Sequence, residues 1–439
     1  MPTRRSSTAT WESVWQADGG AARVAREEDA AGMEMHEGHI AIDAPEGVAS
    51  WDIDPYDAAL LADPAPYYAE LRAKGPFVYL TRYRMLVCGR YAETREVFGD
   101  HDRFVSSRGV GLQDFLYGEP WRSPSIVLEA DPPYHTRTRR VITRALSPRA
   151  VAAMKDLFRA EAGALVDRLL AHGPFEAVSA CAEAFPATVF PKAVGLRESD
   201  TRRLVDYGAM VFNALGPDNA LRSRAMARAG DIVPWINAAC ARENLVAGGF
   251  GAALHAAAED EEITPQEAGM LVRSLLSAGV DTTVSALGNA LWCLATNPGA
   301  MAALAADPGL ARPCFEEVLR VTSPVHSFCR TAGVDTEVGG VAIRAGTKIL
   351  CCLGAANLDE THWEAASEFR IARRPMGHLA FGVGIHNCVG QTLARAEGEA
   401  LLTALAERVA RIEITAPPVW RPNNAIRALD RMGLRFVPK

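Results

Sequence analysis

The residues best suited to chemistry lie in residues 381–390, which read FGVGIHNCVG and run into a helix-forming segment. The glycines permit a tight turn and a close approach of the backbone to a flat group. Cys388 stands at the start of the helix, where the helix dipole and free N–H groups stabilise a thiolate. A thiolate that binds a metal needs such donors near its sulfur. The pattern therefore predicts a metal-ligating Cys388, with His386 able to reach an anionic group at the same rim.

A second pattern is an acid and an alcohol inside an apolar helix. Residues 264–296 are predicted to form one helix, which begins with a capping box at Thr264 and Glu267. Its length of about 50 Å and its apolar faces place it through the centre of the protein. Gly279, Asp281 and Thr282 are locally unfavourable there, which makes them functional candidates. The alternative for Thr282 is a hydroxyl bonded back to its own helix.

Two charged pairs share helix faces. Glu317 and Arg320 are three residues apart, and His135 and Arg139 are four apart. Such pairs are usually surface salt bridges or solvated basic faces. Two donors on one face also suit a carboxylate.

Composition limits the class of protein. The 439 residues carry a net charge of −7, which argues against a nucleic-acid-binding chain. The nine cysteines include no CxxC pair, which disfavours a disulfide framework or a zinc site and favours a reducing compartment. No signal-peptide h-region and no run of about 18 apolar residues occurs, so we expect a cytoplasmic protein without a membrane span.

The chain divides into a short extension and one large domain. Residues 1–46 are polar and weakly patterned, which predicts disorder, with a docking helix over residues 21–33 as the alternative. Residues 47–439 are predicted to form a single domain. Helical periodicity dominates its middle and short strand-like runs lie near both ends, so the fold class is mainly α with a minor β lobe.

Together these motifs resemble those of the cytochrome P450 family, bacterial soluble type, over residues 50–437. The resemblance implies the P450 fold, with the long central helix over a haem b, and monooxygenase activity on O2. Cys388 would be the axial iron ligand. Asp281 and Thr282 would supply protons for O–O bond cleavage. Glu317, Arg320 and Arg373 would brace the cysteine loop. The residues implied to contact the haem are His135, Arg139, Arg330, Phe381, His386, Ala278 and Gly279, with Gly279 opening room beside the iron for O2.

The substrate is predicted from candidate pocket residues. Arginines and hydroxyls converging on an apolar pocket would hold a carboxylate, and aromatic or aliphatic side chains would sandwich a ring. The carboxylate candidates are Arg108, Gln113, Arg273, Ser274 and Ser277, and the ring candidates are Phe212, Leu215, Val325 and Phe328. The alternative for Arg108 is a structural loop arginine.

The sequence around these motifs and candidate pocket residues is similar to that of one branch of the family, which oxidises para-substituted benzoates, notably by O-demethylating methoxybenzoates. Gln113 and Leu215 depart from that branch, where a serine and a phenylalanine are usual. Leu358 and Glu360 also depart from it, in an otherwise familiar turn. The first two departures bear on the preferred ring substituents rather than on the reaction class.

An electron donor is predicted from a basic segment. No acidic residue occurs between Asp131 and Lys155, so Arg137, Arg140 and Arg144 form a local positive patch on the proximal face. Such a patch suits an acidic ferredoxin, supplied from NAD(P)H through a ferredoxin reductase. The alternatives are a peroxygenase, a hydroxylase of another small apolar or natural-product substrate, and a non-catalytic haem sensor.

Overall fold

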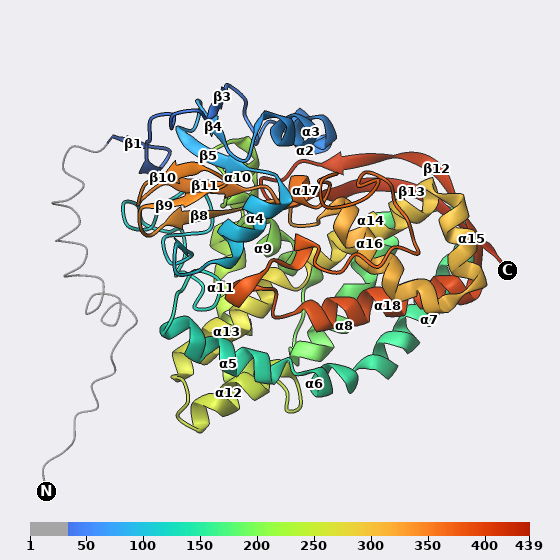
Figure 1. The fold of residues 1–439 in the computed structure, drawn as a ribbon. Helices are drawn as coiled ribbons and strands as arrows, with labels where there is room; N and C mark the ends of the chain where they lie inside the picture. The colour runs from blue at the N-terminus through green and yellow to red at the C-terminus, as the bar shows by residue number, and fades with distance from the viewer. Residues whose placement is uncertain (1–33) are drawn as a thin grey trace, which may run out of the picture.

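The computed structural model describes residues 34–439, in which strands gather on one side and helices fill the rest of the molecule (Figure 1). This agrees with the predicted helix-rich fold with a minor β lobe. No helix within residues 34–439 is both long and apolar enough to cross a membrane.

About half of residues 34–439 are helical, because apolar residues recur with the helical period in these segments. The α-helices are α2 (Ala58–Ala62), α3 (Ala65–Lys74), α4 (Tyr91–Gly99), α5 (Tyr134–Ala145), α6 (Pro148–Ala152), α7 (Lys155–His172), α8 (Ala184–Val194), α9 (Thr201–Asn213), α10 (Ala220–Met226), α11 (Ala229–Ala239), α12 (Phe250–Glu259), α13 (Pro265–Ala278), α14 (Asp281–Thr296), α15 (Pro298–Ala306), α16 (Ala311–Thr322), α17 (Leu353–Ala356) and α18 (Gln391–Arg408). Short 3-10 or π helices are η1 (Val178–Glu183), η2 (Arg242–Asn244), η3 (Pro308–Leu310), η4 (Leu379–Phe381) and η5 (Gly384–His386).

Within residues 34–439 the strands form one main sheet and three smaller ones. The main sheet has the order β3-β4-β5-β11-β8-β6, and β12-β13-β7 form the second sheet. The pairs β1-β2 and β10-β9 complete the set. Their bounds are β1 (Met35–His36), β2 (His39–Ile40), β3 (Ala49–Trp51), β4 (Val78–Leu80), β5 (Met85–Cys88), β6 (Phe104–Val105), β7 (Phe175–Glu176), β8 (Phe328–Ala332), β9 (Thr336–Val338), β10 (Val341–Ile343), β11 (Lys348–Cys351), β12 (Val409–Arg421) and β13 (Ala428–Pro438).

The predicted central helix is two helices. α13 ends at Ala278 and α14 begins at Asp281, with Gly279 and Val280 between them. At the break, side-chain hydroxyls take the place of backbone donors: Thr282 donates to the Ala278 carbonyl at 2.6 Å and Thr283 to the Gly279 carbonyl at 3.0 Å. The expectation of a single continuous helix is therefore wrong at these two residues. The interior location is correct, since almost every side chain of α14 is buried.

The ordered part of the chain starts earlier than residue 47. β1 and β2 form a hairpin, and Ile42 donates its N–H to the Arg84 carbonyl at 3.0 Å. His39 of this hairpin is fully buried. The hairpin is thus part of the folded body rather than of a disordered extension. The rest of the predicted extension, including the alternative helix over residues 21–33, lies outside the described residues.

Candidate active site

The candidate site is a largely apolar cavity between the α13–α14 break and the cysteine loop. Cys388 lines it on one side, and Ala278, Gly279 and Thr282 line it on the other. Cys388 is more than 100 positions from the α13–α14 break in the sequence, so it is the fold that brings the two together. The cavity also receives side chains from α9, from residues 122–129 and from residues 324–328.

The cysteine loop is a tight turn that requires glycine. Gly382 and Gly384 have φ values of +68° and +75°, which side chains disfavour. A Cβ atom on Gly384 would lie 2.7 Å from the Gly99 carbonyl oxygen, so α4 leaves no room for one. The Cys388 N–H donates to the Phe381 carbonyl at 2.7 Å. These contacts hold the sulfur at the cavity wall, just before α18.

The environment of the thiol suits a metal ligand. Burial raises the pKa of Cys388, while the Gly390 N–H and the cations Arg139 and Arg395 act to lower it. A bound metal ion deprotonates a coordinating thiol outright. The same N–H group and cations would then stabilise the thiolate.

Glu317, Arg320 and Arg373 meet as predicted. The Glu317 carboxylate accepts two hydrogen bonds from Arg320, both at 2.8 Å, and one from Arg373 Nε at 2.9 Å. Glu317 and Arg320 are fully buried. Arg320 also donates to the carbonyls of Asn357 and Ala366, at 2.9 and 2.7 Å. The cluster thus ties α16 to the loop that precedes Cys388.

Asn357 extends this cluster in two directions. Its Nδ2 donates to Ser323 Oγ at 2.9 Å, at the end of α16. Its Oδ1 accepts from the Leu379 N–H at 2.7 Å, two residues before Phe381. Asn357 is fully buried, so these bonds are shielded from water. Phe381 itself lines the cavity, beneath the Arg395 guanidinium at 4.4 Å from its ring centroid.

Three buried nitrogens near the cavity rim have no hydrogen-bond partner among the described residues: His135 Nε2, His386 Nε2 and Arg330 Nη2. His386 Nε2 is a donor only when the ring is protonated, because His386 Nδ1 faces the Val127 carbonyl at 3.2 Å. The two imidazole rings lie 4.4 Å apart between centroids, and His386 Nε2 is 3.7 Å from Asp131. Burial lowers the pKa of His135 to about 4, helped by the nearby His386 and Arg139, and it lowers the pKa of Arg330 to about 10. Unpaired buried donors are costly unless a ligand satisfies them. Carboxylates such as haem propionates would do so, and the residues present therefore fit a haem.

Arg139, the fourth predicted haem contact at this rim, has a different principal role. It lines the cavity, but its Nη2 donates to the Asn387 carbonyl at 2.6 Å and to Asn387 Oδ1 at 2.7 Å. Arg139 therefore holds the residue next to Cys388 as well as facing the cavity.

The acid and the alcohol do not face the cavity together. Thr282 lines it, with its hydroxyl bonded back to Ala278, which was the alternative for this residue. Asp281 is buried but turns away, and its Oδ1 accepts from Arg421 Nη2 at 2.7 Å. Asp281 thus does not line the cavity beside Thr282, because Arg421 of β12 holds its carboxylate, and its part in proton supply stays a prediction. Gly279 lines the cavity, but a Cβ there would lie 2.2 Å from the Phe190 ring, so the missing side chain makes room for Phe190.

The predicted substrate residues separate into two groups. Six of them line the cavity: Phe212, Leu215, Ser274, Ser277, Val325 and Phe328. Arg108 does not, because the buried carboxylate of Asp114 binds its guanidinium with Nε at 3.1 Å. Gln113 instead donates to the Glu119 carbonyl at 3.0 Å. Arg273 lies behind the wall and donates to the Ser123 carbonyl at 2.8 Å.

Among the polar lining residues that the sequence prediction missed are Arg122 and Ser125, the latter close to the predicted Ser274. Nη1 of Arg122 is buried and has no hydrogen-bond partner among residues 34–439. Ser125 Oγ lies 3.4 Å from Ser274 Oγ of α13. Their segment, WRSPS, has no periodic pattern. The one available signal was a loop arginine, here between Pro120 and Pro124.

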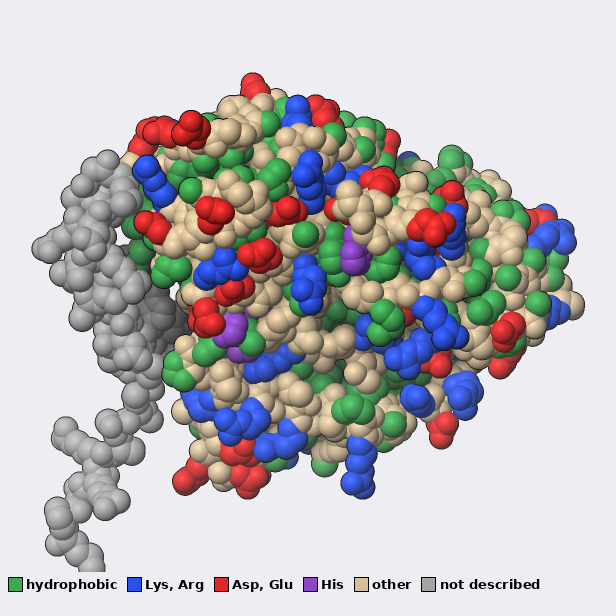
Figure 2. All heavy atoms as spheres, viewed as in Figure 1, with side chains coloured by type: hydrophobic (Ala, Val, Ile, Leu, Met, Phe, Trp, Pro, Cys, Tyr) green, Lys and Arg blue, Asp and Glu red, His purple; other side chains and the backbone are tan. Residues whose placement is uncertain are grey.

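The basic patch around α5 is partly neutralised. Arg137 forms an ion pair with Glu267, and Arg144 bonds to Glu262 with Nη1 at 3.0 Å. Figure 2 shows Asp and Glu side chains next to the Lys and Arg side chains in the region of α5 and α12. The positive patch is thus smaller than predicted, because acidic side chains within residues 262–267 pair with two of its three arginines. Arg140 remains exposed.

Comparisons with known proteins agree with this site. The family model "Cytochrome P450" matches residues 309–409, which include the α16 cluster and the cysteine loop. The chain is 47% identical over 393 residues to "Cytochrome p450 CYP199A2" of Rhodopseudomonas palustris, covering 89% of this chain and 95% of that protein. It is 32% identical to a "Beta-dihydromenaquinone-9 omega-hydroxylase" of Mycobacterium tuberculosis, covering 88% of this chain and 79% of that protein. The structure of cytochrome P450 CYP109Q5 from Chondromyces apiculatus aligns with a TM-score of 0.75 and 30% identity, covering 88% of this chain and 99% of that one.

The fold and the thiol-lined cavity define a haem-thiolate oxidoreductase. The chain belongs to the cytochrome P450 family and is a monooxygenase of that family. Membership implies a haem iron, and the donors and thiol described above fit it.

Proposed function

We propose that this P450 inserts one oxygen atom from O2 into a small aromatic carboxylic acid, by O-demethylation or hydroxylation of a para-substituted benzoate. The observation that carries the proposal is the unpaired, buried Nη1 of Arg122 at a cavity wall that also holds the Ser125 and Ser274 hydroxyls. A carboxylate would accept hydrogen bonds from Arg122 Nη1 and from the Ser125 hydroxyl, whereas the Ser274 hydroxyl donates its hydrogen to the Met270 carbonyl at 2.9 Å.

The charges behind this wall support an anionic ligand. Arg273 is buried next to Arg122, and burial together with the neighbouring Arg122 cation lowers the pKa of Arg273. One acid, Glu129, lies in the same wall, where it accepts the Ser125 N–H at 2.7 Å. Two guanidinium groups and one carboxylate leave a local excess of positive charge. A substrate carboxylate would neutralise it, and a neutral ester would not.

The remainder of the cavity suits an aromatic ring. Phe212, Leu215, Val325 and Phe328 form one apolar cluster on its wall. Flat, apolar walls favour a ring through burial and through aromatic contacts. Leu215 stands where the related branch usually has a phenylalanine. Because leucine is the smaller side chain, we expect the cavity to accept somewhat larger ring substituents.

The haem, held by Cys388, would supply the activation of O2. The protein residues would bind the acid, orient its para substituent toward the iron and exclude water. The Thr282 hydroxyl, at the helix break, lines the cavity and would move a proton there. Hydroxylation of a methoxy carbon, with two electrons and two protons, yields a hemiacetal that collapses to a phenol and formaldehyde, with one water formed from O2.

Substrate class is tested by titrating the ferric protein with 4-methoxybenzoate and with its methyl ester. We expect the acid to shift the iron to high spin and the ester to bind at least about tenfold more weakly, as expected for loss of a charged hydrogen bond. Equal binding of the ester would contradict the carboxylate site and favour hydroxylation of a neutral apolar substrate. Thiolate ligation is checked separately, by the strongly red-shifted Soret band of the reduced protein with carbon monoxide.

We also propose an acidic iron–sulfur donor, a ferredoxin supplied from NAD(P)H through a reductase. The support is the exposed Arg140 on α5, the helix that also carries Arg139 next to the cysteine loop. Replacing Arg140 by Glu should raise the KM for ferredoxin and weaken its dependence on salt, without changing substrate binding. An unchanged KM would place the donor elsewhere.

A further inference from the structure

Two walls of the cavity meet at the tip of the hairpin between β12 and β13. One wall carries Phe212 and Leu215, from the end of α9 and the turn after it. The other carries Val325, from the segment between α16 and β8, and Phe328, the first residue of β8. Ala425 and Ile426 of the hairpin tip pack into the same apolar cluster as these four side chains. The hairpin tip therefore sets the distance between the two walls.

Asn424 fastens the tip to the first wall. Its backbone N–H donates to Asn213 Oδ1 at 3.1 Å, and its Nδ2 donates to the Asn213 carbonyl at 2.8 Å. Its Oδ1 accepts from Asn219 Nδ2 at 2.9 Å, and its Nδ2 also lies 3.3 Å from Asn219 Oδ1. Asn424 is 1% exposed, so both the donors and the acceptor of its amide are used away from water.

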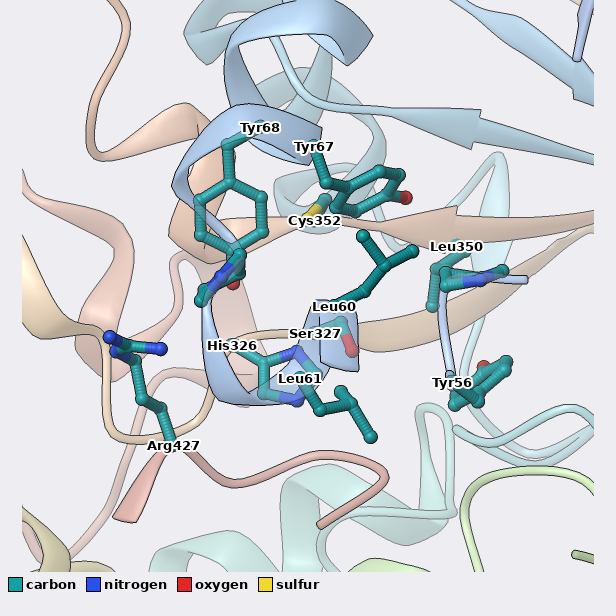
Figure 3. Close-up of a pocket in the computed structure, with 12 residues that line it drawn as sticks. Tyr56, Leu60, Leu61, Tyr67, Tyr68, His326, Ser327, Leu350, Cys352 and Arg427 are labelled. Carbon is teal, nitrogen blue, oxygen red and sulfur yellow. The ribbon is translucent and has the colours of Figure 1, made fainter. Parts of the chain in front are cut away.

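Backbone bonds fasten the same tip to the second wall. The His326 N–H donates to the Ala425 carbonyl at 3.0 Å, and the Arg427 N–H donates to the Pro324 carbonyl at 2.8 Å. Val325 pairs with Ile426 in an antiparallel bridge. The two residues between Val325 and Phe328 are buried and line a different pocket, and Figure 3 shows His326 and Ser327 there with Arg427.

The turn after α9 is tightly packed against the hairpin tip. A Cβ atom on Gly216 would lie 2.5 Å from Asn424 Cγ. The turn after α9 thus lies directly against the Asn424 amide. Any change in the shape or hydrogen bonding of this amide must move the turn that carries Leu215.

We propose that Asn424 is a positioning residue: its amide fixes the spacing between the Phe212–Leu215 wall and the Val325–Phe328 wall, and so selects the ring size accepted in the cavity above Cys388. The role rests on P450 membership and on the contacts above. It does not depend on a carboxylate in the substrate.

The sharpest variant is Asn424→Asp, because the side chain keeps its shape but loses both Nδ2 donors. A carboxylate would then face the Asn213 carbonyl and Asn219 Oδ1, which are both acceptors, and the two walls should separate. Asn219→Ala is a milder second variant that removes the reciprocal bond, together with the capping bond that Asn219 Oδ1 accepts from the Arg222 N–H at 3.0 Å at the start of α10. Asn237→Asp is the matched control, since Asn237 is an exposed residue of α11.

The probes are imidazole and 4-phenylimidazole, added to the ferric haem protein. Both bind the iron through nitrogen, but only the second places a ring between the walls. For Asn424→Asp we expect the affinity for 4-phenylimidazole to fall about tenfold, as expected for a displaced contact surface. Imidazole affinity should stay within roughly twofold, as for substitutions away from a contact. The spectrum of the reduced protein with carbon monoxide should be unchanged.

Equal losses for both probes, or a lower melting temperature with no change in either affinity, would overturn the proposal and leave Asn424 with a purely structural role. If Asn424→Asp does not retain haem, the same comparison on Asn219→Ala decides, with a selective loss for 4-phenylimidazole in support and an equal loss or none against. Neither probe carries a carboxylate. Failure of benzoate binding and failure of this proposal are therefore distinguishable.

Discussion

The Asp281 carboxylate accepts a hydrogen bond from Arg421 at 2.7 Å and does not line the cavity. Its Oδ2 has no partner within the described part of the chain, although Asp281 is 1% exposed. The charge is thus balanced by one cation from β12, and removing that cation leaves a buried, unpaired carboxylate.

We therefore expect Arg421→Met to lower the free energy of unfolding by about 3–5 kcal/mol, the usual cost of breaking a buried pair from one side. Asp281→Asn in the same background should recover much of the loss. Chemical denaturation followed by the haem absorption measures both. An additive effect of the two substitutions would contradict the pairing.

Thr282→Ala should reduce the product formed per electron pair at least about tenfold, because a positioned hydroxyl that moves a proton contributes on that scale or more. Thr283→Ala is the matched control, since Thr283 also lines the cavity and also donates to a carbonyl of the helix break. The measurement is product against NAD(P)H consumed. Equal uncoupling in both variants would assign the effect to the broken helix rather than to the Thr282 hydroxyl.

Arg122→Leu should weaken 4-methoxybenzoate binding by about 10- to 100-fold, the range of one or two charged hydrogen bonds. The methyl ester should be little affected. Spin-state titration gives both dissociation constants.

Arg108→Leu is the contrasting variant. It leaves the buried Asp114 carboxylate unpaired, so we expect a lower melting temperature with an unchanged preference for acid over ester. Loss of the acid preference in this variant would restore Arg108 as a substrate residue.

Glu317→Gln should weaken haem retention, because one carboxylate accepts from both Arg320 and Arg373. We expect a loss of about 3–5 kcal/mol in the free energy of unfolding. The haem-to-protein ratio and the melting temperature measure it. Glu364→Gln, at an exposed position, serves as control and should behave as wild type.

Glu397→Gln should stabilise the protein at alkaline pH. Burial without a charged partner raises the pKa of Glu397 to about 8, from an ordinary value of 4.5. Between these two values the unfolded chain has released the proton and the folded protein still holds it, so the free energy of unfolding falls as pH rises. The fall is about 3 kcal/mol between roughly pH 5 and pH 7.5.

In Glu397→Gln this part of the pH dependence should disappear, with little difference from wild type near pH 5. Glu399→Gln on the same helix is the control. Parallel stability curves for Glu397→Gln and wild type would show that Glu397 does not titrate in this range.

Short-range patterns predicted the haem side of the site well. Cys388 with its glycines, and Glu317 with Arg320, are fixed by spacings of a few residues, and the local backbone decides where such groups lie. The helical body and the interior helix also follow from apolar periodicity. The break at Gly279 does not, because it depends on two threonine hydroxyls replacing backbone donors and on the Phe190 ring against the glycine.

The substrate side depends on contacts that no local pattern records. Arg108 and Arg122 look alike in the sequence, but Asp114 folds back onto the first and leaves the second without a carboxylate partner in the described structure. The Asp281 carboxylate is held away from the cavity by a hydrogen bond from Arg421, which lies 140 residues away in the sequence. The neutralisation of Arg137 and Arg144 likewise comes from a distant segment.

Asn357 joins the two sides of the haem site mechanically. One end of its amide holds Ser323, where the chain enters the Val325–Phe328 wall, and the other holds Leu379, where the chain enters the cysteine loop. The Val325–Phe328 wall and the cysteine loop are therefore both held by the same buried side chain. A displacement of the cysteine loop, such as a docking electron donor would cause, would therefore reach the wall that contacts the substrate through Asn357, in parallel with the Glu317 cluster.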